Sequence, residues 1–162
     1  MPATPYRVLF VCLGNICRSP AADNAFQHLL ASQDLNARIQ CDSAGTIGYH
    51  TGNPPDRRMS ETIRARGIPV SGQARQFHPS DFRKFDLILT MDEDNRHGVL
   101  SLAGSDTDRS RVRRFTDFCS DYDTPDVPDP YYGGPEGFEL VADMIEGGCA
   151  GLLEHILKQI DS

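Results

Sequence analysis

Strand-like and helix-like segments alternate along this chain, and that alternation limits the possible folds more than any other feature. Short apolar runs typical of strands occur at residues 6–11, 39–41, 87–91 and 112–115. Apolar residues at helical spacing follow the first three runs, and another helical stripe closes the chain. The pattern predicts an α/β fold: a four-stranded parallel sheet with helices on both faces, doubly wound in flavodoxin-like order.

Local signals suggest where several helices begin and end. Asn53, followed by two prolines, predicts the start of a second helix that Gly67 ends. Asp92 is a suitable cap for a third helix carrying Val99 and Leu102. The last helix has a regular apolar stripe: Phe138, Val141, Ile145, Cys149, Leu152, Ile156 and Ile160. Two glycines within it, at 147 and 148, are each expected to cost about 1 kcal/mol.

Size and composition predict one domain spanning residues 1–162, with 39% hydrophobic and 24% charged residues in the globular range. A net charge of −7 argues against nucleic acid as a partner. Without a signal peptide or a membrane-length apolar run, we expect a cytoplasmic protein with no membrane partner. Five irregularly spaced cysteines predict reduced thiols, and singly scattered histidines predict no metal site. We expect no cofactor.

The turn after the first strand carries the chemistry. Residues 12–19 read Cys-Leu-Gly-Asn-Ile-Cys-Arg-Ser and run from the predicted strand into the predicted helix. The main-chain N–H groups of such a loop converge on phosphate oxygens, and the helix dipole adds attraction. We therefore predict a phosphate-binding loop made of Leu13, Gly14, Asn15, Ile16, Cys17, Arg18 and Ser19.

Cys12 and Arg18 are the predicted reactive pair of this loop. The amides, Arg18 and the Ser19 hydroxyl all favour a thiolate at Cys12, which makes it a nucleophile. Arg18 can offer two parallel N–H donors to phosphoryl oxygens, which lysine cannot do. The predicted reaction is hydrolysis of a phosphate monoester.

A departing alcohol or phenol also needs a proton. Residues 116–134 form a polar loop, the acid loop, that can supply it. The loop offers five carboxylic acids: Asp117, Asp121, Asp123, Asp126 and Asp129. An acid is defined by its placement, so the residues alone do not choose among them.

The chain resembles the low-molecular-weight protein tyrosine phosphatases, whose loop reads Cys-x5-Arg-Ser directly after the first strand. The resemblance covers essentially the whole chain. It includes Asp42-Ser43-Ala44-Gly45 at the second strand, Thr90-Met91-Asp92-Glu93-Asp94-Asn95 at the third, and Asp129-Pro130-Tyr131-Tyr132 in the acid loop.

The resemblance implies a role for each matching residue. Cys12 is the nucleophile, Arg18 the phosphate clamp and Asp129 the general acid, with no metal. The supporting residues are Ser19, which stabilises the thiolate, and Asn15 and Ser43, which brace the loop. The walls that receive a phenyl ring are Ile16, Tyr49, Tyr131 and Tyr132. The implied substrates are tyrosine-phosphorylated proteins or small aryl phosphates, with phosphate as product.

Two related activities are alternatives. Arsenate reductases of the same fold need further cysteines near the nucleophile, and residues 71–98 contain none. Phosphoarginine phosphatases tend to carry threonine where this chain has Ile16 and to lack the second tyrosine. The sequence departs from the family pattern at Gly72, where similar proteins often place a histidine that holds Asn15.

Cys17 is close enough in sequence to reach Cys12, so a sulfenic acid on Cys12 could be trapped as a reversible disulfide. We expect Cys17→Ser to leave turnover largely intact but to make inactivation by peroxide hard to reverse with a thiol reductant. The measurement is activity regained after peroxide and reductant. Equal recovery in both proteins would contradict the hypothesis.

Overall fold

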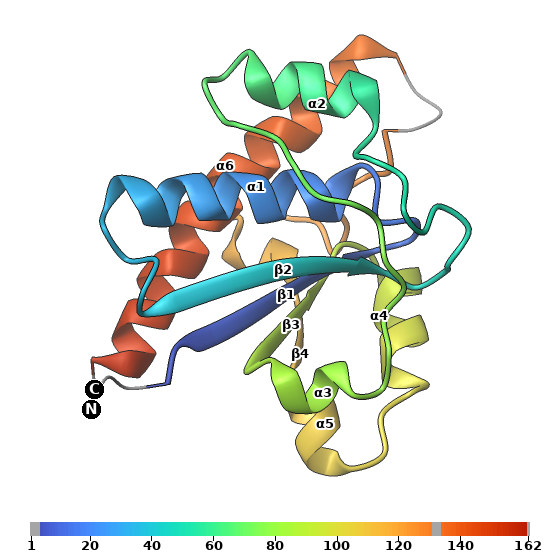
Figure 1. The fold of residues 1–162 in the computed structure, drawn as a ribbon, viewed down its shortest axis with the longest axis vertical. Helices are drawn as coiled ribbons and strands as arrows, with labels where there is room; N and C mark the ends of the chain where they lie inside the picture. The colour runs from blue at the N-terminus through green and yellow to red at the C-terminus, as the bar shows by residue number, and fades with distance from the viewer. Residues whose placement is uncertain (1–3, 131–133, 162) are drawn as a thin grey trace.

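The computed structural model describes residues 4–130 and 134–161, and the centre of this part is one sheet of four parallel strands (Figure 1). The strands are β1 (Tyr6–Cys12), β2 (Ile39–Gly45), β3 (Leu87–Thr90) and β4 (Val112–Arg114). Their order across the sheet is β2-β1-β3-β4, with every neighbouring pair parallel. The predicted flavodoxin-like fold class is confirmed.

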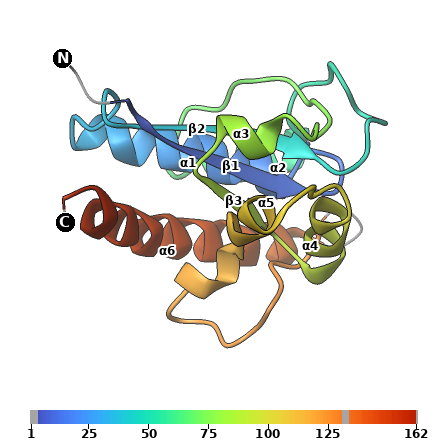
Figure 2. The same ribbon diagram turned by 90° about the horizontal axis from the view of Figure 1, so that it is seen from below.

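Alternate residues of β1 point to opposite faces, and both faces are covered. Val8 and Phe10 lie in one apolar cluster, with residues of α1 (Arg18–Ser32), α2 (Arg57–Arg64) and α6 (Pro135–Ile160). Leu9 and Val11 lie in the other, with residues of α3 (Asp81–Lys84) and α4 (Glu93–Leu100). Figures 1 and 2 show the helices of the two groups on opposite sides of the sheet, with α5 (Asp106–Ser110) beside α3. The sheet is thus doubly wound.

Three of the predicted boundaries need correction. Helix α2 begins at Arg57 rather than near Asn53, because the side chain of Asp56 accepts a hydrogen bond from Met59 N and caps the helix. Helix α4 is capped by Asp92 as predicted but ends at Leu100, before Leu102. The acid loop does not begin as irregular chain, because Phe115–Phe118 form a 3-10 turn, η1.

The register of the strands brings the carboxyl ends of β1 and β2 together. Cys12 is paired with Gly45. A Cβ at Gly45 would lie 2.7 Å from the carbonyl oxygen of Leu13 and 3.0 Å from Asn15 N, so only glycine lets the loop approach the end of β2 this closely. This accounts for the glycine in the Asp42–Gly45 motif.

The paired glycines of α6 have different surroundings. A Cβ at Gly148 would overlap the ring of Phe115 and lie 2.9 Å from Cys119 Sγ, whereas Gly147 is exposed with nothing within 4 Å. Gly148 therefore allows α6 to pack against η1.

We expect Gly148→Ala to lower the free energy of unfolding by about 1–3 kcal/mol because it overpacks this contact. Gly147→Ala, its matched control, should raise it by about 0.5–1 kcal/mol because alanine favours the helix. Urea denaturation measures both. Equal effects of the two substitutions would contradict the packing explanation.

Candidate active site

The site is built on the turn from β1 into α1. Cys12 ends the strand, Arg18 begins the helix, and Asn15 between them has φ 59°, a left-handed conformation that asparagine tolerates. The helix has no side-chain cap at Cys17 and no acidic residue in its first turn. The positive end of α1 therefore receives no acidic side chain from the first turn of the helix itself.

Three carbonyl groups of this turn accept hydrogen bonds from the segment that follows β2. Those of Cys12, Leu13 and Ile16 accept hydrogen bonds from the N–H groups of Thr46, Ile47 and Asp56, at 2.9, 3.1 and 2.7 Å. Within the described residues, no N–H group from residue 13 to residue 19 has a hydrogen-bond partner. Amides grouped in this way, at a helix start, suit an anion such as phosphate.

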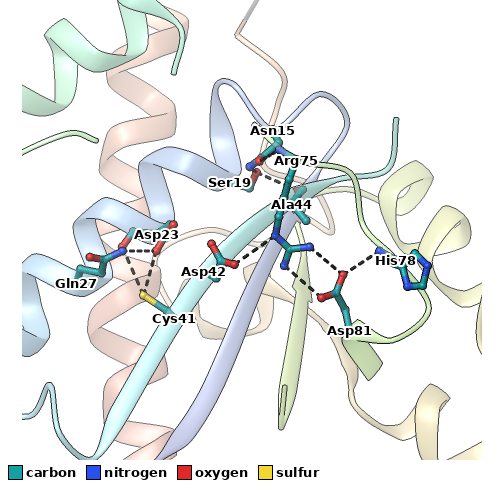
Figure 3. Close-up of polar contacts among 10 residues, drawn as sticks. All are labelled: Asn15, Ser19, Asp23, Gln27, Cys41, Asp42, Ala44, Arg75, His78 and Asp81. Carbon is teal, nitrogen blue, oxygen red and sulfur yellow. Dashed lines mark hydrogen bonds and ion pairs between the residues drawn. The ribbon is translucent and has the colours of Figure 1, made fainter. Parts of the chain in front are cut away.

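A series of hydrogen bonds links Cys12 through Ser19 and Asn15 to the main chain of Arg75. Cys12 Sγ lies 3.0 Å from Ser19 Oγ, which accepts a hydrogen bond from Asn15 Nδ2 at 2.8 Å. The side-chain oxygen of Asn15, Oδ1, accepts a hydrogen bond from the main-chain N–H of Arg75 at 2.9 Å (Figure 3). Both ends of the Asn15 side chain are thus satisfied, which fixes the loop residue with positive φ.

Ser19 has a single hydroxyl hydrogen to give. Because Asn15 occupies an acceptor position of Oγ, that hydrogen goes to Cys12 Sγ at 3.0 Å or to the carbonyl of Ala44 at 3.3 Å. Of the two acceptors, the sulfur is the closer. Stabilisation of a Cys12 thiolate by Ser19 stays a prediction.

Arg18 is buried, with 2% of its surface exposed, and two protein groups hold one end of its guanidinium. Nη1 donates to Asp92 Oδ2 at 2.6 Å and to the carbonyl of Val127 at 3.0 Å. Nη2 lies 3.6 Å from Asp129 Oδ2. Burial alone would lower the pKa of Arg18, but the neighbouring Cys12, Asp92 and Asp129 outweigh it and raise the pKa. Arg18 thus stays protonated.

Cys12, Arg18 and Asp129 line one cavity of about 380 Å³. Its other lining residues are those of the turn and of the segment after β2: Leu13, Gly14, Ile16, Cys17, Ile47, Tyr49 and His50. A larger cavity of about 710 Å³ lies between α2 and the start of α6, but it contains none of the three residues. The three predicted catalytic residues therefore share the smaller cavity.

The other predicted site residues are placed as follows. Cys17 is buried beside the cavity, and burial, followed by the charges of Asp56 and Cys12, raises the pKa of its thiol, so it remains protonated. Tyr49 stands 84% exposed at the cavity wall. Tyr131 and Tyr132 lie outside the described residues.

Ser43 is buried beside Asn15, but its hydroxyl faces Asp23. Burial raises the pKa of Asp23, and hydrogen bonds from Gln27, Cys41 and Ser43 partly offset the increase. Gln27 and Cys41 approach that carboxylate at 2.7 and 3.2 Å (Figure 3). A bracing role for Ser43 stays a prediction.

Several groups at the site were not foreseen from the sequence. Asp92 was predicted only as a helix cap, yet its Oδ1 caps Asn95 N while its Oδ2 holds Arg18. Its position after a parallel strand was a usable signal. Val127 and Arg75 contribute main-chain groups, which leave no side-chain signal. His50 packs over Gly14, where a Cβ would lie 2.8 Å from its Cδ2.

The described residues show neither a metal-binding cluster nor a membrane-spanning helix. No group of three or more His, Cys, Asp or Glu side chains there is arranged to hold a metal ion. Nor does any helix there have both the length and the apolar character needed to cross a membrane.

Comparison with known proteins gives a consistent result. The family model for low molecular weight phosphotyrosine protein phosphatase matches residues 7–162. Low molecular weight protein-tyrosine-phosphatase YfkJ of Bacillus subtilis is 46% identical over 153 residues, covering 94% of this chain and 96% of the relative. The human low molecular weight phosphotyrosine protein phosphatase is 40% identical over 150 residues, covering 91% and 93%.

A solved structure extends the likeness to three dimensions. The protein tyrosine phosphatase of Entamoeba histolytica, with Hepes in the active site, has a TM-score of 0.91 at 40% identity, covering 95% of this chain and 98% of that one. Fold and relatives define this protein as a protein tyrosine phosphatase. The chain belongs to the low molecular weight phosphotyrosine protein phosphatase family. The resemblance is confirmed, and these comparisons favour neither arsenate reduction nor phosphoarginine hydrolysis.

The contact between Ser19 and Cys12 gives a prediction. Ser19→Ala removes the hydrogen bond predicted to stabilise a Cys12 thiolate, worth about 1.5–3 kcal/mol, and should slow alkylation of Cys12 by iodoacetate at pH 7 about 10- to 100-fold. Ser32→Ala, at the exposed end of the same helix, is the control and should alkylate at the wild-type rate. An unchanged rate in Ser19→Ala would contradict the assigned role.

Proposed function

We propose that this phosphatase hydrolyses phosphotyrosine in proteins, and small aryl phosphate monoesters, through a phosphocysteine on Cys12 and without a metal. The observation that carries the proposal is the common cavity of Cys12, Arg18 and Asp129, beside amides that have no hydrogen-bond partner in residues 4–130 and 134–161. Nucleophile, positive charge and acid are the three groups that this reaction requires.

In the first step, the Cys12 thiolate attacks phosphorus and the bond from phosphorus to the phenolic oxygen breaks. Asp129, as the carboxylic acid, gives its proton to that oxygen, so the product leaves as a neutral phenol. Arg18 and the loop amides meet the charge on the phosphoryl oxygens. Asp92 and Val127 occupy Nη1, so in this proposal the phosphate is met by Nη2, which lies 3.6 Å from Asp129 Oδ2.

In the second step, water attacks the phosphocysteine. Asp129, now ionised, takes a proton from the water, the new bond from oxygen to phosphorus forms, and the bond from phosphorus to sulfur breaks. Inorganic phosphate and the Cys12 thiolate result. The hydrogen bond from Ser19 stabilises the sulfur as it leaves, as it does when sulfur attacks.

The cavity walls support an aryl substrate. Leu13 and Ile16 come from the loop, and Tyr49 comes from the segment after β2. Apolar and aromatic walls of this kind suit the flat face of a phenyl ring. Tyr131 and Tyr132, predicted from the family resemblance, would add to them.

The test is hydrolysis of p-nitrophenyl phosphate and phenyl phosphate in the presence of a chelator, compared as kcat/KM. Cys12→Ser should abolish turnover, and Arg18→Ala should cost at least about 10²–10³. Asp129→Ala should cost about 10²–10⁴ with phenyl phosphate, whose leaving phenol is weakly acidic, and less with p-nitrophenyl phosphate. Equal losses on both substrates would mean that Asp129 is not the acid, and loss of wild-type activity in the chelator would contradict the metal-free scheme.

A further inference from the structure

The acid loop is attached to the rest of the site two and three residues before Asp129. Val127 is fully buried, its N–H donates to the carbonyl of Met91 at 2.7 Å, and its carbonyl accepts from Arg18 at 3.0 Å. Just before it, Oδ1 of Asp126 accepts a hydrogen bond from Glu93 N at 2.9 Å. The loop therefore contacts the start of α4, where Arg18 is also held.

The start of α4 has two carboxylate partners with separate tasks. Asp92 bonds Asn95 N with one oxygen and Arg18 with the other. Asp126 takes the N–H of Glu93, the first residue of the helix, which would otherwise lack a partner there. A carboxylate at a helix N-terminus also interacts favourably with the helix dipole. Asp126 thus anchors the loop to the helix.

The short segment after this anchor is stiff. Pro128 and Pro130 have fixed φ angles, and each restricts the residue before it to extended conformations. Val127 and Asp129 are those preceding residues, so few torsions remain free between the anchor and the acid. A change in direction at Asp126 is therefore passed on to the Asp129 carboxylate rather than absorbed.

We propose that Asp126 is a positioning residue for Asp129, acting through the hydrogen bond from Glu93 N. The inference rests on the proposed function, in which Asp129 is the general acid. Asp126 is not itself the acid, because its carboxylate bonds α4 and it is not among the residues that line the cavity. Of the five acids in the loop, Asp129 gives the proton and Asp126 holds Asp129 in position.

The experiment measures the leaving-group ratio: kcat/KM for p-nitrophenyl phosphate divided by kcat/KM for phenyl phosphate. This ratio does not depend on the fraction of folded enzyme. Misplacing a reacting group by about 1 Å costs up to about 10²-fold, so Asp126→Ala should raise the ratio about tenfold. Asp126→Asn keeps an oxygen acceptor and should stay within about twofold of wild type. Asp123→Ala, an exposed acid of the same loop, is the control and should leave the ratio unchanged.

A second pair of variants removes the donor instead of the acceptor. Glu93 is the first residue of α4, where proline is favoured, and Asp92 before it is already extended, with φ −148° and ψ 174°. Glu93→Pro deletes the N–H and should raise the ratio as Asp126→Ala does. Glu93→Ala removes the same side chain, keeps the N–H and should leave the ratio at the wild-type value.

The double variant Asp126→Ala/Asp129→Ala completes the test. If Asp126 acts only through Asp129, the double variant has the ratio of Asp129→Ala alone. A wild-type ratio in Asp126→Ala, an Asn variant as impaired as the Ala variant, or an additional effect in the double variant would each overturn the inference. If Asp129→Ala itself leaves the ratio unchanged, the proposed function fails, whatever Asp126 does.

Discussion

The site depends on one constraint: three carbonyl groups between β1 and α1 are hydrogen-bonded to the chain that follows β2. Each residue of a turn carries a donor and an acceptor, so amides can gather at one point only if the carbonyls are satisfied elsewhere. Thr46, Ile47 and Asp56 supply those partners from the chain that follows β2. The predicted anion site is therefore a property of two chain segments, since the carbonyls of Cys12, Leu13 and Ile16 find these partners after β2.

The burial of Arg18 imposes a second requirement. A buried guanidinium needs a charged or hydrogen-bonding partner, because an unpaired buried charge is strongly unfavourable. Asp92 provides the charge from the end of β3, and Val127 provides a carbonyl from the acid loop. The same contacts that make burial tolerable also tie Arg18, the proposed phosphate clamp, to the acid loop. Arg18 and the proposed acid Asp129 are consequently held in one arrangement, as the proposed reaction requires.

The alternation of strands and helices was enough to predict the sheet and its order, and residues 12–19 were enough to predict a turn from the first strand into the first helix. What escaped prediction has physical reasons. A carboxylate has two oxygens, and the capping pattern at Asp92 accounts for only one of them. Val127 and Arg75 act through main-chain groups that any residue carries. Helix α2 was started too early because Asn53 and Asp56 are both good caps, and only the structure selects the one that bonds Met59.

The departure from the family pattern at Gly72 is explained by what supports Asn15 instead. Gly72 has φ +110°, a conformation in which a histidine would be strained, so a substitution there could not simply restore the expected side chain. The Asn15 amide receives its hydrogen bond from the main-chain N–H of Arg75. That main chain is itself fixed, because the Arg75 carbonyl accepts from Gly45 N at 2.9 Å and its guanidinium is held by both oxygens of buried Asp81. The support behind the loop therefore comes from the pair of Arg75 and Asp81 and does not require a side chain at residue 72.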